Sequence, residues 1–366
     1  MTSLEHHSSH TTALELETFS NTLRSNRMGI LCLQTNEIER ALEHFAMAFS
    51  RHEIAKSKLF ARMEITVNGW ILSNEDGNNN QNVENSIGRK LGNWFTPCPL
   101  PMQQRSIDRN AMGAGPAGED FLHFEPIQLP MLVTETLSDM LAAYEKGDRV
   151  CCKELLDTMV LLSICHAYNL GITYHLCGHR ILSSFKEERS IQVDSSASTQ
   201  IIPSNAKILF DRAGQMYEYI LQLEYSGFMD RDHHHQSSGY KGRLQTDSNV
   251  PRLIIVLACT NNLADLYHTS GHVLSSRGCY RQLKATTKRL AGFLRPGGHS
   301  RDEILLCSYL PTFWERSRMG LARRRSNSSA ISEEMERGDE DSVNNLPLMS
   351  LVQKLFGFIG TSAAAA

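Results

Sequence analysis

The sequence predicts a mainly α protein: an irregular stack of antiparallel helical hairpins with a small two-stranded β element and disordered inserts. Apolar residues recur at intervals of three and four over most of the chain, which is the spacing of one helix face. Inserts rich in Asn, Ser and Gly separate the helical segments. Hydrophobic residues make up 41% and charged residues 21% of the 366 residues, as in an ordinary globular protein.

The first helices are expected between residues 13 and 50, divided at Thr35 and Asn36, after a His- and Ser-rich N-terminus at 1–12 that we expect to be disordered. The following stretch, Ala61–Val67, alternates apolar and polar residues and predicts a strand. A second strand is predicted at 121–127, where Pro126 suits an edge position. We expect the two strands to pair and to enclose a long polar loop at about 74–119.

The remaining helices follow from the same apolar spacing. They are expected at 132–144, at 149–176 with an end at Gly178, at 205–225, at 251–269, at 274–294, and at 301–319 with a bend or break at Pro311. Loops are predicted at about 186–204 and 227–249, and Pro251 suits the first turn of a helix. The helical domain would then cover 13–319, followed by a charged linker at 320–345 and an apolar C-terminal segment and tail at 346–366.

Composition limits the classes of partner and the compartment. The 37 Lys and Arg against 40 Asp and Glu give a net charge of −3, which provides no basic field for nucleic acid. We see no secretory signal and no apolar stretch that we judge long enough to span a bilayer. Nine cysteines without a Cys-x-x-Cys pair indicate free thiols. We therefore expect a cytoplasmic protein, with the nucleus left open.

Three stretches share one arrangement of small and large residues. In the first helix of each pair a small residue (Gly29, Gly171 or Ala264) is followed three positions later by Cys32, Tyr174 or Tyr267. The second helix then carries a small residue and, four positions later, an aromatic residue. These pairs are Ala41 and Phe45, Ala213 and Tyr217, and Ser276 and Tyr280. The small residues allow two helices to cross closely, and the aromatic residues fill the space between them.

This arrangement resembles the tetratricopeptide repeat family, over about a third of the chain. The resemblance implies helical hairpins that hold a segment of another protein in a concave groove. The chain departs from the family at the tryptophan position, where Ser25, Ala167 and Thr260 stand instead, and the three repeats are not contiguous.

The same resemblance places a set of residues on the groove side of each first helix. They are Asn26, Arg27, Tyr168, Asn169, His175, Asn261, Asn262, Asp265 and His268. An Asn carboxamide both donates and accepts hydrogen bonds, so it can pair with the backbone of an extended peptide. Bonds from these residues to neighbouring helices of the same chain are the alternative, and the sequence leaves both open. Only Arg27 is basic, which disfavours a clamp for a C-terminal carboxylate.

Motifs for catalysis are weak. The run Gly113–Gly118 matches the phosphate turn of flavin-binding folds in its letters, but polar residues precede it and a predicted strand follows it, instead of the strand and helix that such a turn needs. His233–His235, beside Asp230 and Asp232, lie in a polar insert that lacks a scaffold for a metal. We expect no enzyme activity, no cofactor and no metal.

The sequence thus predicts a non-catalytic scaffold or adaptor that binds a peptide or helix of an unidentified protein partner. One alternative is a flavin- or nucleotide-dependent enzyme that uses Gly113–Gly118. Another is a helical domain autoinhibited by its own C-terminal segment, residues 346–359. Ser326 and Ser328 follow Arg323–Arg325 and are candidate phosphorylation sites, because a phosphate beside arginines and ahead of an acidic run would change the contacts of this tail.

Overall fold

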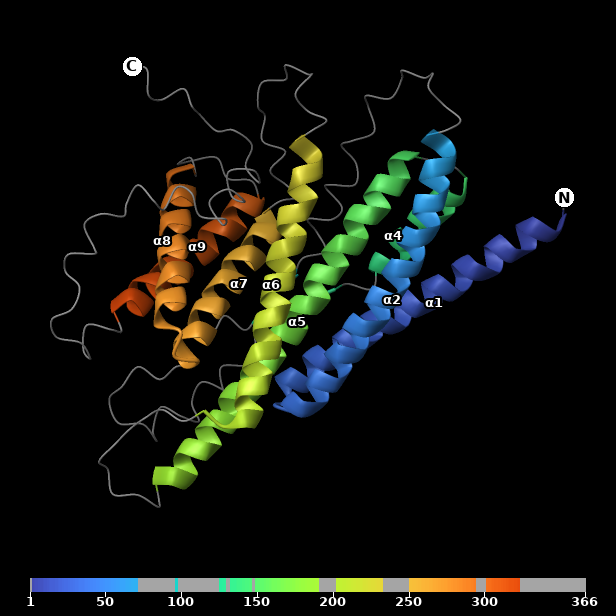
Figure 1. Ribbon diagram of the computed structural model, residues 1–366. Helices are drawn as coiled ribbons and strands as arrows, with labels where there is room; N and C mark the ends of the chain where they lie inside the picture. Colours follow the sequence, from blue (N-terminus) through green and yellow to red (C-terminus); the bar gives the residue numbers. More distant parts are fainter. Residues whose placement is uncertain are drawn as a thin grey trace, which may run out of the picture. The chain divides into compact units, whose positions relative to one another are not determined.

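The computed structural model describes residues 2–71, 96–97, 125–129, 132–146, 149–190, 202–232, 250–293 and 301–322 (Figure 1). These residues are mainly helical, as predicted, and form eight helices in the described part of the chain. The chain divides into two units. Unit 1 is Met1–Ser106 with Glu125–Thr173, and unit 2 is Ile107–Phe124 with Tyr174–Ala366.

Unit 1 is built on a hairpin of two long helices, α1 (Thr2–Gln34) and α2 (Ile38–Ile71), which lie side by side (blue in Figure 1). Helix α1 begins within the segment for which we expected disorder. The unit also contains α4 (Leu132–Glu145) and the first part of α5 (Arg149–Ser190). Two short strands, β1 (Thr96–Pro97) and β2 (Ile127–Gln128), pair antiparallel with Thr96 opposite Gln128.

Unit 2 contains the rest of α5 together with α6 (Ser204–Asp232), α7 (Val250–Thr269), α8 (Val273–Phe293) and α9 (Arg301–Ala322). Helices α7, α8 and α9 pack against one another, and α6 packs against α7. Pro251 stands in the first turn of α7 as predicted, where its missing N–H would have no helical partner.

The two hairpins α1–α2 and α7–α8 end their first helix in the same way. At the first turn Asn36 has a φ of 63°, and the N–H of Glu37 donates to Cys32 O at 2.7 Å. At the second turn Gly271 has a φ of 79°, and the N–H of His272 donates to Tyr267 O at 2.7 Å. A left-handed residue that lets the next N–H reach back is a common helix end, favoured by Gly and Asn.

Small residues meet aromatic rings at the crossings of these hairpins. A Cβ added to Gly29 would lie 2.7 Å from the ring of Phe45, so only glycine allows this approach. In unit 2 the buried Ala264 packs with Tyr280, and the Ser276 hydroxyl donates to Ala264 O at 2.7 Å. The small and aromatic positions found in the sequence therefore face each other in both hairpins.

Helix α5 is buried on all sides between Leu162 and Thr173. An 18-residue window within its span Leu155–Glu188 has a mean hydropathy of 1.4, so by length and composition the helix is apolar enough to cross a membrane. Our expectation that no stretch reaches this length was therefore wrong. Because 78% of the apolar window is buried in protein, it matches the central helix of a soluble protein equally well.

The strand predicted at 61–67 and the helix end predicted near Gly178 were wrong. Residues 61–67 form the end of α2 rather than a strand, because Ala55, Leu59 and Met63 continue the helical spacing of its buried face. Helix α5 does not end near Gly178 but continues to Ser190. Of the bend or break predicted at Pro311, the break is absent, because residues 301–319 lie in a single helix.

Candidate functional site

Most of the predicted groove residues lie in the interior of the protein. Seven of the nine are buried, whereas Arg27 is exposed and His268 is half-buried. The buried residues are Asn26, Tyr168 and Asn169 in unit 1, and His175, Asn261, Asn262 and Asp265 in unit 2. Asn26 and Asn169 belong to a polar cluster in unit 1, and the four residues of unit 2 belong to another.

In unit 1 the side chain of Asn169 holds an extended piece of backbone. Its Oδ1 accepts a hydrogen bond from the N–H of Ile127 at 2.7 Å, and its Nδ2 donates to Ile127 O at 2.9 Å. The Nδ2 of Asn26, on α1, donates to the same carbonyl oxygen at 3.3 Å. Two amide side chains thus satisfy both backbone groups of one buried residue, which would be costly to bury without partners.

Asn169 pairs with one edge of the strand β2. In an extended chain the N–H and C=O of one residue point to the same edge, and those of the next residue point to the other edge. Ile127 turns its backbone groups to Asn169, while Gln128 stands opposite Thr96 of β1. Because Pro126, Ile127 and Leu129 are buried and Gln128 is exposed, the segment 125–129 is held as a short extended ligand would be. We call the surroundings of Ile127 formed by Asn26 and Asn169 the backbone seat.

The two asparagines of the seat are fixed by each other and by a histidine. Asn169 Nδ2 donates to Asn26 Oδ1 at 2.9 Å, and His166 Nδ1 lies 3.3 Å from the same oxygen. Since an amide oxygen only accepts, His166 carries its proton on Nδ1 if this bond forms. Burial lowers the pKa of His166 well below its usual value, so the ring is neutral.

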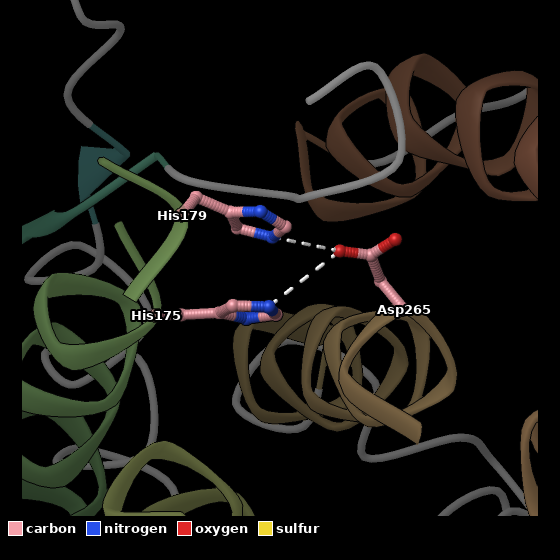
Figure 2. Close-up of side chains that lie close together, drawn as sticks. All are labelled: His175, His179 and Asp265. Carbon is pink, nitrogen blue, oxygen red and sulfur yellow. Dashed lines mark hydrogen bonds and ion pairs between the residues drawn. The ribbon is translucent and has the colours of Figure 1, made fainter. Parts of the chain in front are cut away.

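In unit 2 two histidines on successive turns of α5 meet a carboxylate from α7. Figure 2 shows the rings of His175 and His179 one above the other, both directed towards Asp265. Asp265 Oδ2 lies 3.5 Å from His175 Nε2 and 3.2 Å from His179 Nε2. The rings are nearly parallel, with centroids 4.9 Å apart, and Phe210 packs its ring edge-on against both. We call these three residues the His–His–Asp cluster.

Burial and contact set the charges of the His–His–Asp cluster. Burial lowers the pKa of His175 to about 4, although the contact with Asp265 opposes this shift. Burial alone would raise the pKa of Asp265, but its close contacts with the two histidines outweigh burial and hold that pKa below its usual range. At neutral pH the cluster therefore combines an ionised carboxylate with a neutral His175.

A second layer of side chains supports His175. Its Nδ1 lies 3.4 Å from the hydroxyl of Tyr217, and Asn262 Nδ2 donates to that hydroxyl at 3.3 Å. Asn261 in turn donates to Asn262 Oδ1 at 3.2 Å. Asn169 and Asn262, which the predicted register makes equivalent, thus have different partners: a strand backbone in unit 1 and a tyrosine in unit 2.

Sequence reasoning missed the roles of His166, His179 and Ile127. His179 is four residues after His175, and this spacing on one helix face was the available signal. Ile127 was expected in a strand, but nothing in its local sequence marks it as the partner of Asn169. Gly113–Gly118, His233–His235, Ser326, Ser328 and residues 346–366 lie outside the described residues.

Comparisons with known proteins provide no family for the chain: no family description, no curated protein and no solved structure matches it.

Proposed function

We propose that the chain is a non-catalytic adaptor that binds an extended segment of a partner protein by its backbone. The observation that carries the proposal is the pair of hydrogen bonds between Asn169 and Ile127, supported by Asn26. This arrangement of donor and acceptor suits the backbone of any non-proline residue. Neighbouring side chains of the bound segment would then supply specificity.

The hairpins favour a repeat protein similar to the tetratricopeptide family. In support, α1–α2 and α7–α8 share one turn, and each places a small residue of the first helix against an aromatic residue of the second. Proteins built from such hairpins commonly expose grooves for other chains. The net charge of −3 also fits a protein partner better than nucleic acid.

In the structure the backbone seat holds the chain's own segment, residues 125–129. A partner would therefore compete with this segment. While the segment 125–129 occupies the backbone seat, the protein inhibits its own binding of a partner. The alternative that the C-terminal segment closes a groove concerns residues outside the described part of the chain. The segment 125–129, by contrast, contacts Asn169 and Asn26 through the backbone of Ile127, so we take it as the intramolecular competitor.

A competition experiment tests this function. Ile127→Pro removes the N–H that donates a hydrogen bond to Asn169 Oδ1, so residues 125–129 of the variant should leave the seat. We expect a labelled peptide with the sequence of residues 121–133 to bind the Ile127→Pro chain and not the wild-type chain, by fluorescence anisotropy. Adding Asn169→Ala should weaken this binding about tenfold or more, because two hydrogen bonds of about 1 kcal/mol each are lost.

The matched control is Asn205→Ala, which removes an exposed amide from the start of α6 and should leave peptide binding unchanged. Proteins captured from lysate by the Ile127→Pro chain should be lost with the additional Asn169→Ala change. If the peptide binds both chains equally, or neither, while circular dichroism shows that both are folded, the seat does not bind partners.

A further inference from the structure

The His–His–Asp cluster has the ligand set of a metal centre. Imidazole nitrogen and carboxylate oxygen are common ligands of first-row divalent ions, and zinc in particular is bound by three protein groups in many proteins. Two histidines at positions i and i+4 present their rings on one face of a helix. Here that face of α5 meets Asp265 of α7, and one ligand atom from each residue lies within 4.8 Å of the others.

The distances are close to those between two ligands of one ion. Charge-assisted N–H···O⁻ bonds are usually about 2.7–2.9 Å long. The carboxylate oxygen of Asp265 lies 3.2 Å from His179 Nε2 and 3.5 Å from His175 Nε2. Ligands bound tetrahedrally at about 2.0–2.1 Å from zinc stand roughly 3.3 Å from one another.

The nitrogen of His175 that faces the cluster is otherwise unused. His175 is fully buried, and among the described residues its Nε2 faces the Asp265 carboxylate at 3.5 Å, too far for a regular hydrogen bond. A buried polar atom without a bond is uncommon and calls for an explanation such as an ion.

The surroundings supply the outer support that metal-binding histidines usually have. With Nε2 on an ion, the ring proton of His175 is carried by Nδ1 and is donated to the oxygen of Tyr217. Asn262 holds that tyrosine in place. Because the two imidazole planes differ by only 17°, binding requires at least one ring to turn so that both lone pairs point to a single position.

We propose that His175, His179 and Asp265 form a binding site for a divalent transition metal, with Zn²⁺ as the ion that suits it best. The ion would join α5 to α7 inside unit 2, and a water molecule would take the fourth position, as in zinc sites with three protein ligands. Neither the backbone seat nor the proposed partner binding takes part in it.

The test uses the full chain with His233→Ala, His234→Ala and His235→Ala as background, so that the consecutive histidines of the insert do not bind the probe. We expect one Zn²⁺ per chain in equilibrium dialysis, and a visible absorption band when Co²⁺ replaces it. Asp265→Asn keeps the shape of the side chain but removes its charge. This change should weaken Zn²⁺ binding at least about 100-fold and abolish the Co²⁺ band.

His272→Gln is the control, because it removes an exposed histidine that lies in the same unit. Binding should be unchanged in this variant. If Asp265→Asn does not fold, His179→Gln, at a residue that is 8% exposed, should show the same loss. Binding that is absent from the background chain, or equally strong in the folded Asp265→Asn or His179→Gln variant, would overturn the proposal.

Discussion

His52 is the centre of a buried polar contact between α2 and α5 in unit 1. Its Nε2 lies 3.0 Å from Met159 O and 3.1 Å from Ser163 Oγ. Because a carbonyl oxygen only accepts, the proton of His52 is on Nε2. Ser163 in turn donates to Glu53 at 2.7 Å and accepts from Lys56 at 2.9 Å. The network thus fixes the tautomer of a histidine that is 0% exposed.

The charge state of His52 makes unit 1 sensitive to acid. Burial lowers the pKa of His52 to about 4. The hydrogen bond to Met159 and the charge of Glu53 raise this pKa in part, and the charge of Lys56 lowers it. An unfolded histidine has a pKa of about 6.5, so between pH 6.5 and 4 the unfolded chain binds the proton and the folded chain does not. The contribution of neutral His52 to the free energy of unfolding is fully present above pH 6.5 and is lost as the pH falls towards 4.

We predict that His52→Gln flattens the pH dependence of unfolding. Glutamine does not titrate, and its Nε2 can still donate to Met159 O. At pH 4 the wild-type chain should have lost about 3 kcal/mol through His52 relative to pH 7.5, since one pKa unit corresponds to about 1.4 kcal/mol. Urea unfolding at both pH values measures this. The free energies of the two proteins should converge as the pH falls, and parallel curves would contradict the assignment.

At the scale of helices, close crossings depend on glycine facing an aromatic ring. In unit 2 a Cβ added to Gly178 would lie 2.5 Å from the ring of Phe210, which also packs against His175 and His179. Gly178 therefore allows α5 and α6 to approach each other and keeps Phe210 beside the His–His–Asp cluster. The sequence register had placed the crossing at Gly171 and Tyr217, whereas this contact lies further along α5.

Gly178→Ala should destabilise the protein by about 2 kcal/mol, because the added methyl group overlaps a buried ring. Gly278→Ala is the matched control: a Cβ there meets nothing within 4 Å, and alanine should stabilise helix α8 by up to about 1 kcal/mol. Chemical denaturation measures both variants. Phe210→Leu should partly rescue Gly178→Ala, and a Gly178→Ala protein as stable as Gly278→Ala would argue against the crossing.

Local sequence predicted the helices well where apolar spacing and turn residues agree. The division at Thr35 and Asn36 and the helix that begins near Pro251 are both present. Local sequence was misleading where the apolar spacing fits both a strand and a helix. Ala61–Val67 alternates as a strand does, but Met63 within it also continues the buried helical face that includes Leu59. Gly178 resembles a helix end, yet its lack of a side chain serves packing within a continuous helix.

For the whole molecule, sequence identified most of the polar residues of both clusters but not their arrangement. Asn169, His175 and Asp265 were named through one supposed groove, and the structure divides them between two units. The partner of Asn169 lies 42 residues away in the chain, and that of His179 lies 86 residues away. Contacts at such separations depend on how helices pack, which periodicity does not encode.

Hydrogen exchange at the Ile127 amide tests most directly whether Asn169 holds the backbone of residue 127. In the wild-type chain this N–H should be protected by its bond to Asn169 Oδ1. Asn169→Ala should accelerate its exchange by about tenfold or more, while Asn205→Ala leaves it unchanged. Fast exchange at Ile127 in the wild-type chain, or equal rates with and without the Asn169 side chain, would contradict the backbone seat and the function built on it.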